Sequence, residues 1–200
     1  MKYITFRVFD DISYQCMRKT LTNIGPELNN NFNLLIDVED EDLFLRARNE
    51  WSDLLEGCSY GEVRVIYKEK IKDYLEDALA QIIVVYPYHI LGTGAIKRLN
   101  LDDELLNYGF IAIQSHDECF KSNDLYDELN TELIKLSDCK QIRDGVYIVD
   151  TTYNATYMLS VQNFKQFFFN DNNLGLYLRR LGYTNFIDSN IVVKEAITDG

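Results

Sequence analysis

Two glycines separated by one residue follow an apolar segment near the middle of the chain. Residues 81–86 (QIIVVY) form the continuous apolar run of a strand buried on both faces. Gly92-Thr93-Gly94 comes next, and a helix-like segment with Lys97 and Arg98 follows. Phosphate-binding loops have this order of strand, glycines and helix, because the amides at a helix N-terminus then point at the anion. The motif therefore raises the question of a nucleotide site.

The spacing of the motif favours a simple turn. A dinucleotide-binding loop needs a third glycine, and Lys97 stands at that position. A Walker loop needs Ser or Thr after its lysine, whereas Arg98 follows Lys97. In favour of a nucleotide, Asp117 lies 25 residues after Gly92, roughly where a ribose-binding carboxylate belongs. The alternative is thus a small-molecule or nucleotide-binding protein, including an enzyme, that uses Gly92, Gly94, Lys97, Arg98, Asp117 and His89.

Metal and catalytic chemistry have few candidate residues. His116 and Cys119 have the spacing of a ligand pair, and Cys139 could add a third ligand, but structural zinc needs four. We therefore expect an exposed loop there, with no metal and no other cofactor. His89 and His116 are the only histidines, and neither lies in a recognised nucleophile motif. The sequence predicts no catalytic residue and favours a protein that is not an enzyme, without deciding the question.

Composition points to an acidic protein that binds other molecules. The chain of 200 residues has 32 acidic and 20 basic residues and a net charge of −12, which disfavours direct binding to nucleic acid and favours a protein partner with a basic surface. It has no apolar run long enough to cross a membrane, no secretory signal and no closely paired cysteines. We expect a cytoplasmic protein without membrane contact; the sequence does not set its oligomeric state.

The elements that must position these residues predict an α+β fold, with mixed sheet and several amphipathic helices. The expected strands are residues 4–9, 32–38, 62–67, 81–86, 110–114, a hairpin over 145–160, and 185–193. The expected helices are 10–24, 37–57, 71–79, 95–107, 123–137, 161–169 and 174–182. We expect one module over residues 1–200, with possible sub-lobes 1–90 and 91–200 that meet near the glycines.

Several segments give the chain a pattern that resembles a loosely defined group of bacterial immunity-type proteins, some with paired C-x-x-C-G motifs. The segments are KYITFRVFDD, CSYGEVRVIYKEKIKDYLEDA, HDECF and the C-terminal GVYIVDTTYNATYMLSVQNFKQFF with LRRLGYTNFIDSNIV. The paired cysteines are missing here, since Tyr60 and Gly61 follow Cys58. The resemblance implies a toxin-neutralising or regulatory binding role.

Taken together, these features predict a non-enzymatic acidic protein that inhibits or neutralises a protein partner. Arg179, Arg180 and Tyr183 stand out in the acidic C-terminal half as a candidate contact patch, because Arg and Tyr are frequent anchors in interfaces. A further alternative is a phage-type inhibitor that mimics nucleic acid. That alternative needs carboxylates gathered on one face, whereas this sequence scatters them.

Overall fold

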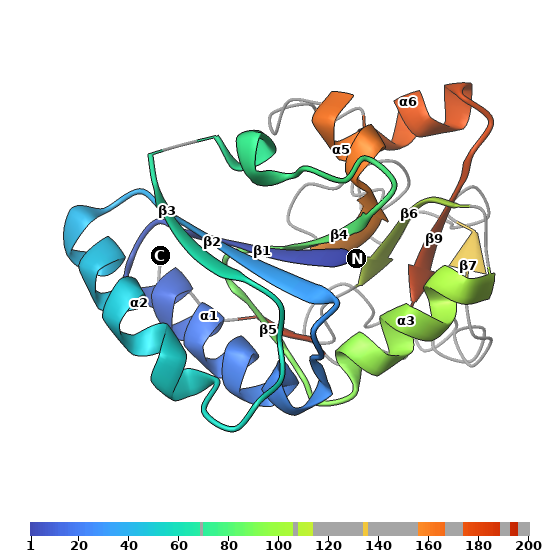
Figure 1. Cartoon of the computed structure of the whole chain (residues 1–200). Coiled ribbons are helices and arrows are strands. Elements are labelled where there is room, and N and C mark those ends of the chain that lie inside the picture. Colours follow the sequence, from blue (N-terminus) through green and yellow to red (C-terminus); the bar gives the residue numbers. More distant parts are fainter. Residues whose placement is uncertain are drawn as a thin grey trace.

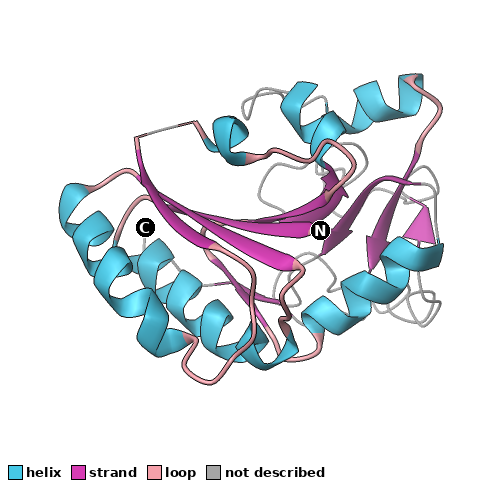
Figure 2. Cartoon of the chain, viewed as in Figure 1, coloured by secondary structure: helices cyan, strands magenta, loops and turns pink. Residues whose placement is uncertain are grey.

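A computed structural model describes residues 1–68, 70–105, 108–113, 134–135, 156–166, 174–188 and 193–195. Within these residues, eight strands form one mixed sheet in the order β3-β2-β1-β4-β8-β6-β9-β7. Helices lie on both faces of this sheet (Figures 1 and 2). The predicted α+β fold with a mixed sheet and several helices is confirmed.

The N-terminal half alternates strands and helices. Its elements are β1 (Lys2–Val8), α1 (Asp11–Ile24), the short 3₁₀ turn η1 (Gly25–Glu27), β2 (Phe32–Val38), α2 (Glu41–Leu54), β3 (Val63–Tyr67), the 3₁₀ turn η2 (Ile71–Tyr74) and β4 (Gln81–Val85). β1 lies between β2 and β4 and pairs in parallel with both. β3 adds to β2, also in parallel. Helical crossovers of this kind are what parallel pairing requires.

The second half of the chain extends the sheet beyond β4 with both antiparallel and parallel pairs. The elements are β5 (His89–Leu91), α3 (Ala95–Leu105), β6 (Tyr108–Ile113), β7 (Ile134–Lys135), β8 (Thr156–Ser160), α5 (Val161–Gln166), α6 (Leu174–Arg180), β9 (Thr184–Asp188) and β10 (Val193–Glu195). β8 lies antiparallel between β4 and β6, so one sheet continues from the first half of the chain into the second. β5 pairs separately with β10.

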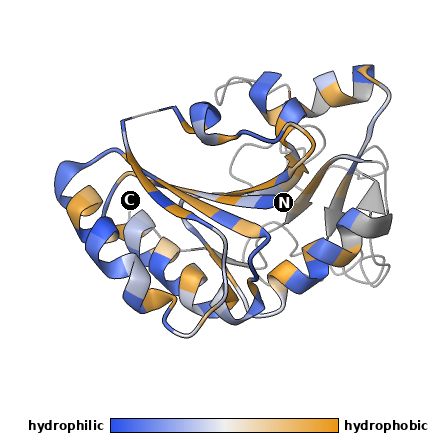
Figure 3. Cartoon of the chain, viewed as in Figure 1, coloured by the Kyte–Doolittle hydropathy of each residue, from blue (hydrophilic) through white to orange (hydrophobic). Residues whose placement is uncertain are grey.

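The two faces of the sheet carry two apolar cores. In β1, Ile4, Phe6 and Val8 point into the core beneath α1 and α2, whereas Tyr3 belongs to the core beneath η2, α5 and α6. The four residues of β4 from Ile82 to Val85 are all buried, as the apolar run predicts. Figure 3 shows apolar residues along the strands and hydrophilic residues interspersed along the covering helices.

Both N-terminal helices begin at an aspartate. Asp10 accepts a hydrogen bond from the Ser13 amide at 2.8 Å, and the Ser13 hydroxyl accepts one from the Asp10 amide, which completes a capping box. Asp40 caps α2 through the Leu43 amide at 3.0 Å. The acidic run at residues 39–42 therefore lies at the start of α2, where negative charge interacts favourably with the positive end of the helix dipole.

The predicted helix over residues 71–79 is wrong. Only Ile71–Tyr74 form a helical turn, of the 3₁₀ type, and Leu79 is 85% exposed. The amides of Leu79 and Ala80 donate to Asp77 and not to the carbonyls four residues earlier. The Ala78 and Ala80 carbonyls accept the amides of Gln162 and Val161 at the start of α5. Tertiary pairing thus overrides the helical spacing of the apolar residues.

Two predictions fall in the second half. The helix expected over 123–137 is contradicted at Ile134–Lys135, which form a strand beside β9. The first arm of the hairpin expected over 145–160 lies outside the described residues. Among the helices that the structure describes, none has the length and apolar character to span a membrane.

Candidate functional site

The strand order creates a switch point at the carboxyl ends of β1 and β4. The chain leaves β1 through α1 toward β2 and β3, and then returns to β4 on the opposite side of β1. In open α/β sheets, ligands bind in the crevice at such a point, outside the carboxyl ends of the strands. Phe9 and Asp10 follow β1 here, and Tyr86 and Tyr88 follow β4. We call these four residues, with Arg7, the switch-point edge.

Aromatic rings dominate the switch-point edge. The rings of Tyr86 and Tyr88 meet edge to face with centroids 5.7 Å apart. The Arg7 guanidinium carbon lies 4.8 Å from the centre of the Phe9 ring. All four side chains are half-buried, so each keeps some surface for a ligand. Such rings can stack on a flat base or pack against the apolar face of a sugar.

The Asp10 carboxylate links the two strand ends. The Tyr88 hydroxyl donates to Asp10 Oδ2 at 3.0 Å. Burial raises the pKa of Asp10, but the hydrogen bonds from Ser13 and Tyr88 outweigh it and leave this pKa below its usual value. Asp10 is therefore ionised at neutral pH and holds Tyr88 over the start of α1.

A second group of charges gathers around the carboxyl end of β2. Arg7 lies 3.1 Å from Glu39 Oε1 and 3.6 Å from Asp37 Oδ2. Burial raises the pKa of Asp37, although Arg7 opposes the shift. Glu39 and Asp40 are exposed at the end of the strand. The end of β2 therefore offers carboxylate oxygens to hydroxyl groups, and Arg7 offers a guanidinium to an anion.

His89 has a positioning role behind these rings. Its Nδ1 lies 3.0 Å from the hydroxyl of Thr156 in β8, and the same hydroxyl accepts the Tyr86 amide at 3.0 Å. Its ring contacts the Tyr86 ring with centroids 4.9 Å apart. Burial lowers the pKa of His89 to about 4, so the ring is neutral at physiological pH. His89 and Thr156 thus fix the turn that presents Tyr86.

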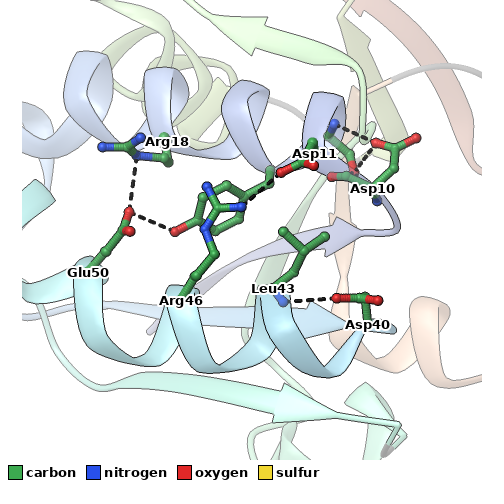
Figure 4. Close-up of polar contacts among 9 residues, drawn as sticks. Asp10, Asp11, Arg18, Asp40, Leu43, Arg46 and Glu50 are labelled. Carbon is green, nitrogen blue, oxygen red and sulfur yellow. Dashed lines mark hydrogen bonds and ion pairs between the residues drawn. The ribbon is translucent and has the colours of Figure 1, made fainter.

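Charged contacts connect α1 with α2 (Figure 4). Arg46 reaches Asp11 at 2.8 Å across the two helices. Glu50 accepts the buried Tyr14 hydroxyl at 2.8 Å and lies 3.5 Å from Arg18. Burial, and then Glu50, raise the pKa of Tyr14 to about 12, so this phenol stays protonated.

The glycine motif lies away from this edge, in the turn between β5 and α3. Gly94 has a φ of +94°, which suits glycine. The amides of Gly94 and Lys97 both donate to the carboxylate of Glu27, at 3.0 Å for Lys97. These are the amides that a bound phosphate would need. Arg98 is half-buried nearby, and Asp117 lies outside the described residues.

The other candidates from the sequence are the metal ligands and the contact patch, and the metal ligands cannot be placed. His116, Cys119 and Cys139 lie outside the described residues; among the residues that are described, no three or more His, Cys, Asp or Glu gather as a metal site. Arg179 and Arg180 end α6, where Arg180 is exposed. Tyr183 is half-buried against the core beneath η2, α5 and α6. The contact patch built on these three residues stays a prediction.

Sequence reasoning missed Phe9, Asp10, Tyr86 and Tyr88 as site residues. Phe9 and Tyr86 are the last residues of two predicted strands, 4–9 and 81–86, and Asp10 and Tyr88 lie within two residues of these ends, which is the available signal. The sequence does not show that β1 and β4 are neighbours, because strand order depends on contacts between residues far apart in the sequence.

Comparisons with known proteins identify the fold. No family model and no curated protein matches the chain. The fold is shared with S. aureus TarS, residues 1–349, in complex with UDP-GlcNAc, with a TM-score of 0.64 at 11% identity. That superposition covers 100% of this chain and 60% of the other. The UDP complex of the same fragment gives a TM-score of 0.61 at 9% identity, and covers 99% of this chain and 61% of that one.

The longer S. aureus TarS structure has a TM-score of 0.57 at 9% identity over 98% of this chain and 36% of its own. The chain thus spans about 60% of the 349-residue fragment. At these identities the likeness shows the fold. It nevertheless overturns the predicted non-enzymatic inhibitor or immunity-type protein, because the fold is that of a protein solved with a nucleotide sugar. The alternative of a nucleotide-binding protein is the better supported of the two.

Proposed function

We propose that this chain binds a nucleoside diphosphate sugar at the switch-point edge. The observation that supports this most is the superposition of the whole chain on TarS in complex with UDP-GlcNAc. The switch point supplies a second, independent argument, since ligands of open α/β sheets bind there. The proposal moves the nucleotide from the Gly92–Gly94 loop to the ends of β1 and β4.

The rings of the edge provide the surface for the base. Phe9 follows β1 and Tyr86 and Tyr88 follow β4, so a flat base between the strand ends has aromatic neighbours on two sides. Stacking of this kind contributes about 1–3 kcal/mol for each base. The His89–Thr156 contact keeps Tyr86 in place without taking part in the chemistry.

Carboxylates beside the switch-point edge provide acceptors for hydroxyl groups. Glu39 and Asp40 are exposed at the end of β2, and an ionised carboxylate accepts hydrogen bonds only. Ribose and sugar hydroxyls are donors that fit these groups. Arg7 supplies a guanidinium beside this set, since it lies 3.1 Å from Glu39 and 3.6 Å from Asp37. Mg²⁺ often joins carboxylates to substrate phosphates, so binding is to be measured with and without it.

The activity class that fits this ligand is sugar transfer. In sugar transfer, the bond between the sugar and the phosphate oxygen of a UDP-sugar breaks, the sugar passes to an acceptor, and UDP is released. The proposal for this chain rests on binding of the donor, because the chain spans about 60% of the TarS fragment that it resembles. The acceptor of the sugar is left open.

Isothermal titration with UDP-GlcNAc, UDP and ADP tests the proposal, each with Mg²⁺ and with EDTA. We expect UDP-GlcNAc or UDP to bind and to raise the melting midpoint; saturation at a hundred times Kd adds about 2.7 kcal/mol of stability. Phe9→Ala should weaken binding about tenfold or more. Tyr60→Ala is the matched control, because Tyr60 packs on Trp51 before β3 begins, away from this edge. Absence of heat with all three nucleotides at millimolar concentration would refute the proposal.

We also propose that the protein works in the cytoplasm. Within the described residues, Cys16 and Cys58 are free, which suits a reducing compartment. The predicted basic protein partner, and the predicted lack of nucleic-acid and membrane contact, stay predictions. Cell fractionation with a tagged chain tests the location; recovery in a compartment outside the cytoplasm would contradict it.

A further inference from the structure

A cavity of about 640 Å³ lies along the outer side of α1, separate from the switch-point edge. Figure 1 shows α1 between α2 and β5, and the cavity is lined from these three sides. Five residues of α1 at the spacing of one helix face form its floor: Gln15, Arg18, Lys19, Thr22 and Asn23. Leu54 at the end of α2 and Gly92-Thr93 after β5 form the walls.

The charge of this cavity is opposite to that of the chain. Arg18 and Lys19 line it, and no carboxylate is among the described residues that line it, although the chain has 32 acidic and 20 basic residues. Lys19 is exposed. Glu50 lies 3.5 Å from Arg18 and offsets the charge of that guanidinium, so Lys19 supplies the net cationic charge. The cavity therefore attracts anions.

Residues from α2 and β5 partly enclose the cavity, unlike a helix face that is open to solvent. Gly92 adds no side chain, and Leu54 and Ile90 shield the cations on two sides. The Asn23 amide donates to the Leu91 carbonyl at 2.8 Å, and the Thr20 hydroxyl accepts the Leu91 amide at 3.1 Å. These bonds hold β5 against α1, so the cavity keeps its shape without a ligand.

The position of the cavity distinguishes it from the proposed nucleotide site. Lys19 follows Asp11, at the start of α1, by eight residues, which places the two about 12 Å apart along the helix. The Gly94 and Lys97 amides next to the cavity are already bound to Glu27. Recognition of an anion here must therefore come from side chains.

We propose that this cavity binds a small organic phosphate ester. Arg18 supplies a planar guanidinium, which can donate two parallel hydrogen bonds, and Lys19 supplies a mobile ammonium group. Arginine and lysine are the side chains that proteins most use to bind phosphate. The volume is within the range of cavities that hold small organic ligands, and it is much larger than one phosphate ion needs. Gln15 lies on the same face for the organic part, and so does the Thr22 hydroxyl, which donates to the Arg18 carbonyl at 3.1 Å and can still accept a hydrogen bond.

Titration with glucose 6-phosphate, inorganic phosphate and glucose tests this at low salt. We expect glucose 6-phosphate to bind in the presence of saturating UDP, inorganic phosphate to bind at least about fivefold more weakly, and glucose not to bind. Lys19→Gln should weaken glucose 6-phosphate binding about tenfold, with an unchanged melting midpoint because Lys19 is exposed. Arg48→Ala removes an exposed cation from α2 outside the cavity and should leave binding unchanged.

Three results would overturn the proposal. The first is no binding of glucose 6-phosphate at millimolar concentration. The second is equal weakening by Lys19→Gln and Arg48→Ala, which would show general attraction to cations. The third is displacement of glucose 6-phosphate by UDP, which would place both ligands at one site. Because UDP binding is measured separately, failure here is distinguishable from failure of the nucleotide proposal.

Discussion

The Glu27 carboxylate accepts a hydrogen bond from the backbone amide of Gly94, 67 residues further along the chain. The same carboxylate accepts the Lys97 amide at 3.0 Å. An acidic side chain from η1 thus fills the place at the start of α3 where an anion would bind. The glycine motif has the backbone shape of an anion site, and the protein supplies the anion itself.

Replacing Glu27 should therefore destabilise the fold. Glu27→Ala leaves two amides at the start of α3 without their acceptor, and loss of such a cap costs about 1–2 kcal/mol. Glu27→Gln keeps one acceptor oxygen and should cost less. Urea denaturation of both variants measures this. Equal stability of Glu27→Ala and the parent protein would show that water replaces the carboxylate without loss.

Local signals in the sequence predict the elements well, and the site poorly. The helix from Asp11 to Ile24 and its Asp10 cap follow from neighbouring residues, and the structure has both. Asp10 and Tyr88 are 78 residues apart in sequence, and they meet only because β4 pairs beside β1. The false helix at residues 71–79 has the same origin, since Ala78 and Ala80 bind α5 instead. Helical spacing and capping are local, whereas strand order is not.

The stability of the protein should fall as pH decreases from about 6.5. Burial lowers the pKa of His89 to about 4 in the folded state, while the unfolded chain keeps a value near 6.5. Between these values the unfolded state binds more protons, so acid favours unfolding. From pH 7 to pH 5, the free energy of unfolding should decrease by about 1–2 kcal/mol through this residue. Urea titrations at half-unit pH steps measure the slope.

His89→Gln is the control for this pH effect. The variant has no titrating ring beside Thr156, so the slope between pH 5 and pH 6.5 should flatten, even where the overall stability is lower. Measurements stay above pH 5 because carboxylates begin to protonate below it. A slope that persists in His89→Gln would assign the effect to another group.

Asp37→Asn should make the protein slightly more stable at neutral pH. Burial raises the pKa of Asp37 in the folded state, so the folded form loses stability as pH rises through the range between its unfolded and folded values. The neutral amide avoids that cost, and Arg7 keeps its contact with Glu39 at 3.1 Å. We expect a gain within about 1 kcal/mol. A lower urea midpoint for the variant would mean that the Arg7 contact outweighs the burial of the charge.

Tyr88→Phe tests the switch-point edge with the smallest change. The variant keeps the ring that packs on Tyr86 and removes only the hydroxyl that donates to Asp10 at 3.0 Å. Asp10 still caps α1 through Ser13, so the stability should decrease by only about 1 kcal/mol. Since the freed ring is less well held, UDP-GlcNAc should bind several-fold more weakly, whereas Tyr60→Phe should bind as the parent does. Wild-type affinity in Tyr88→Phe, together with wild-type affinity in Phe9→Ala, would move the nucleotide away from the ends of β1 and β4.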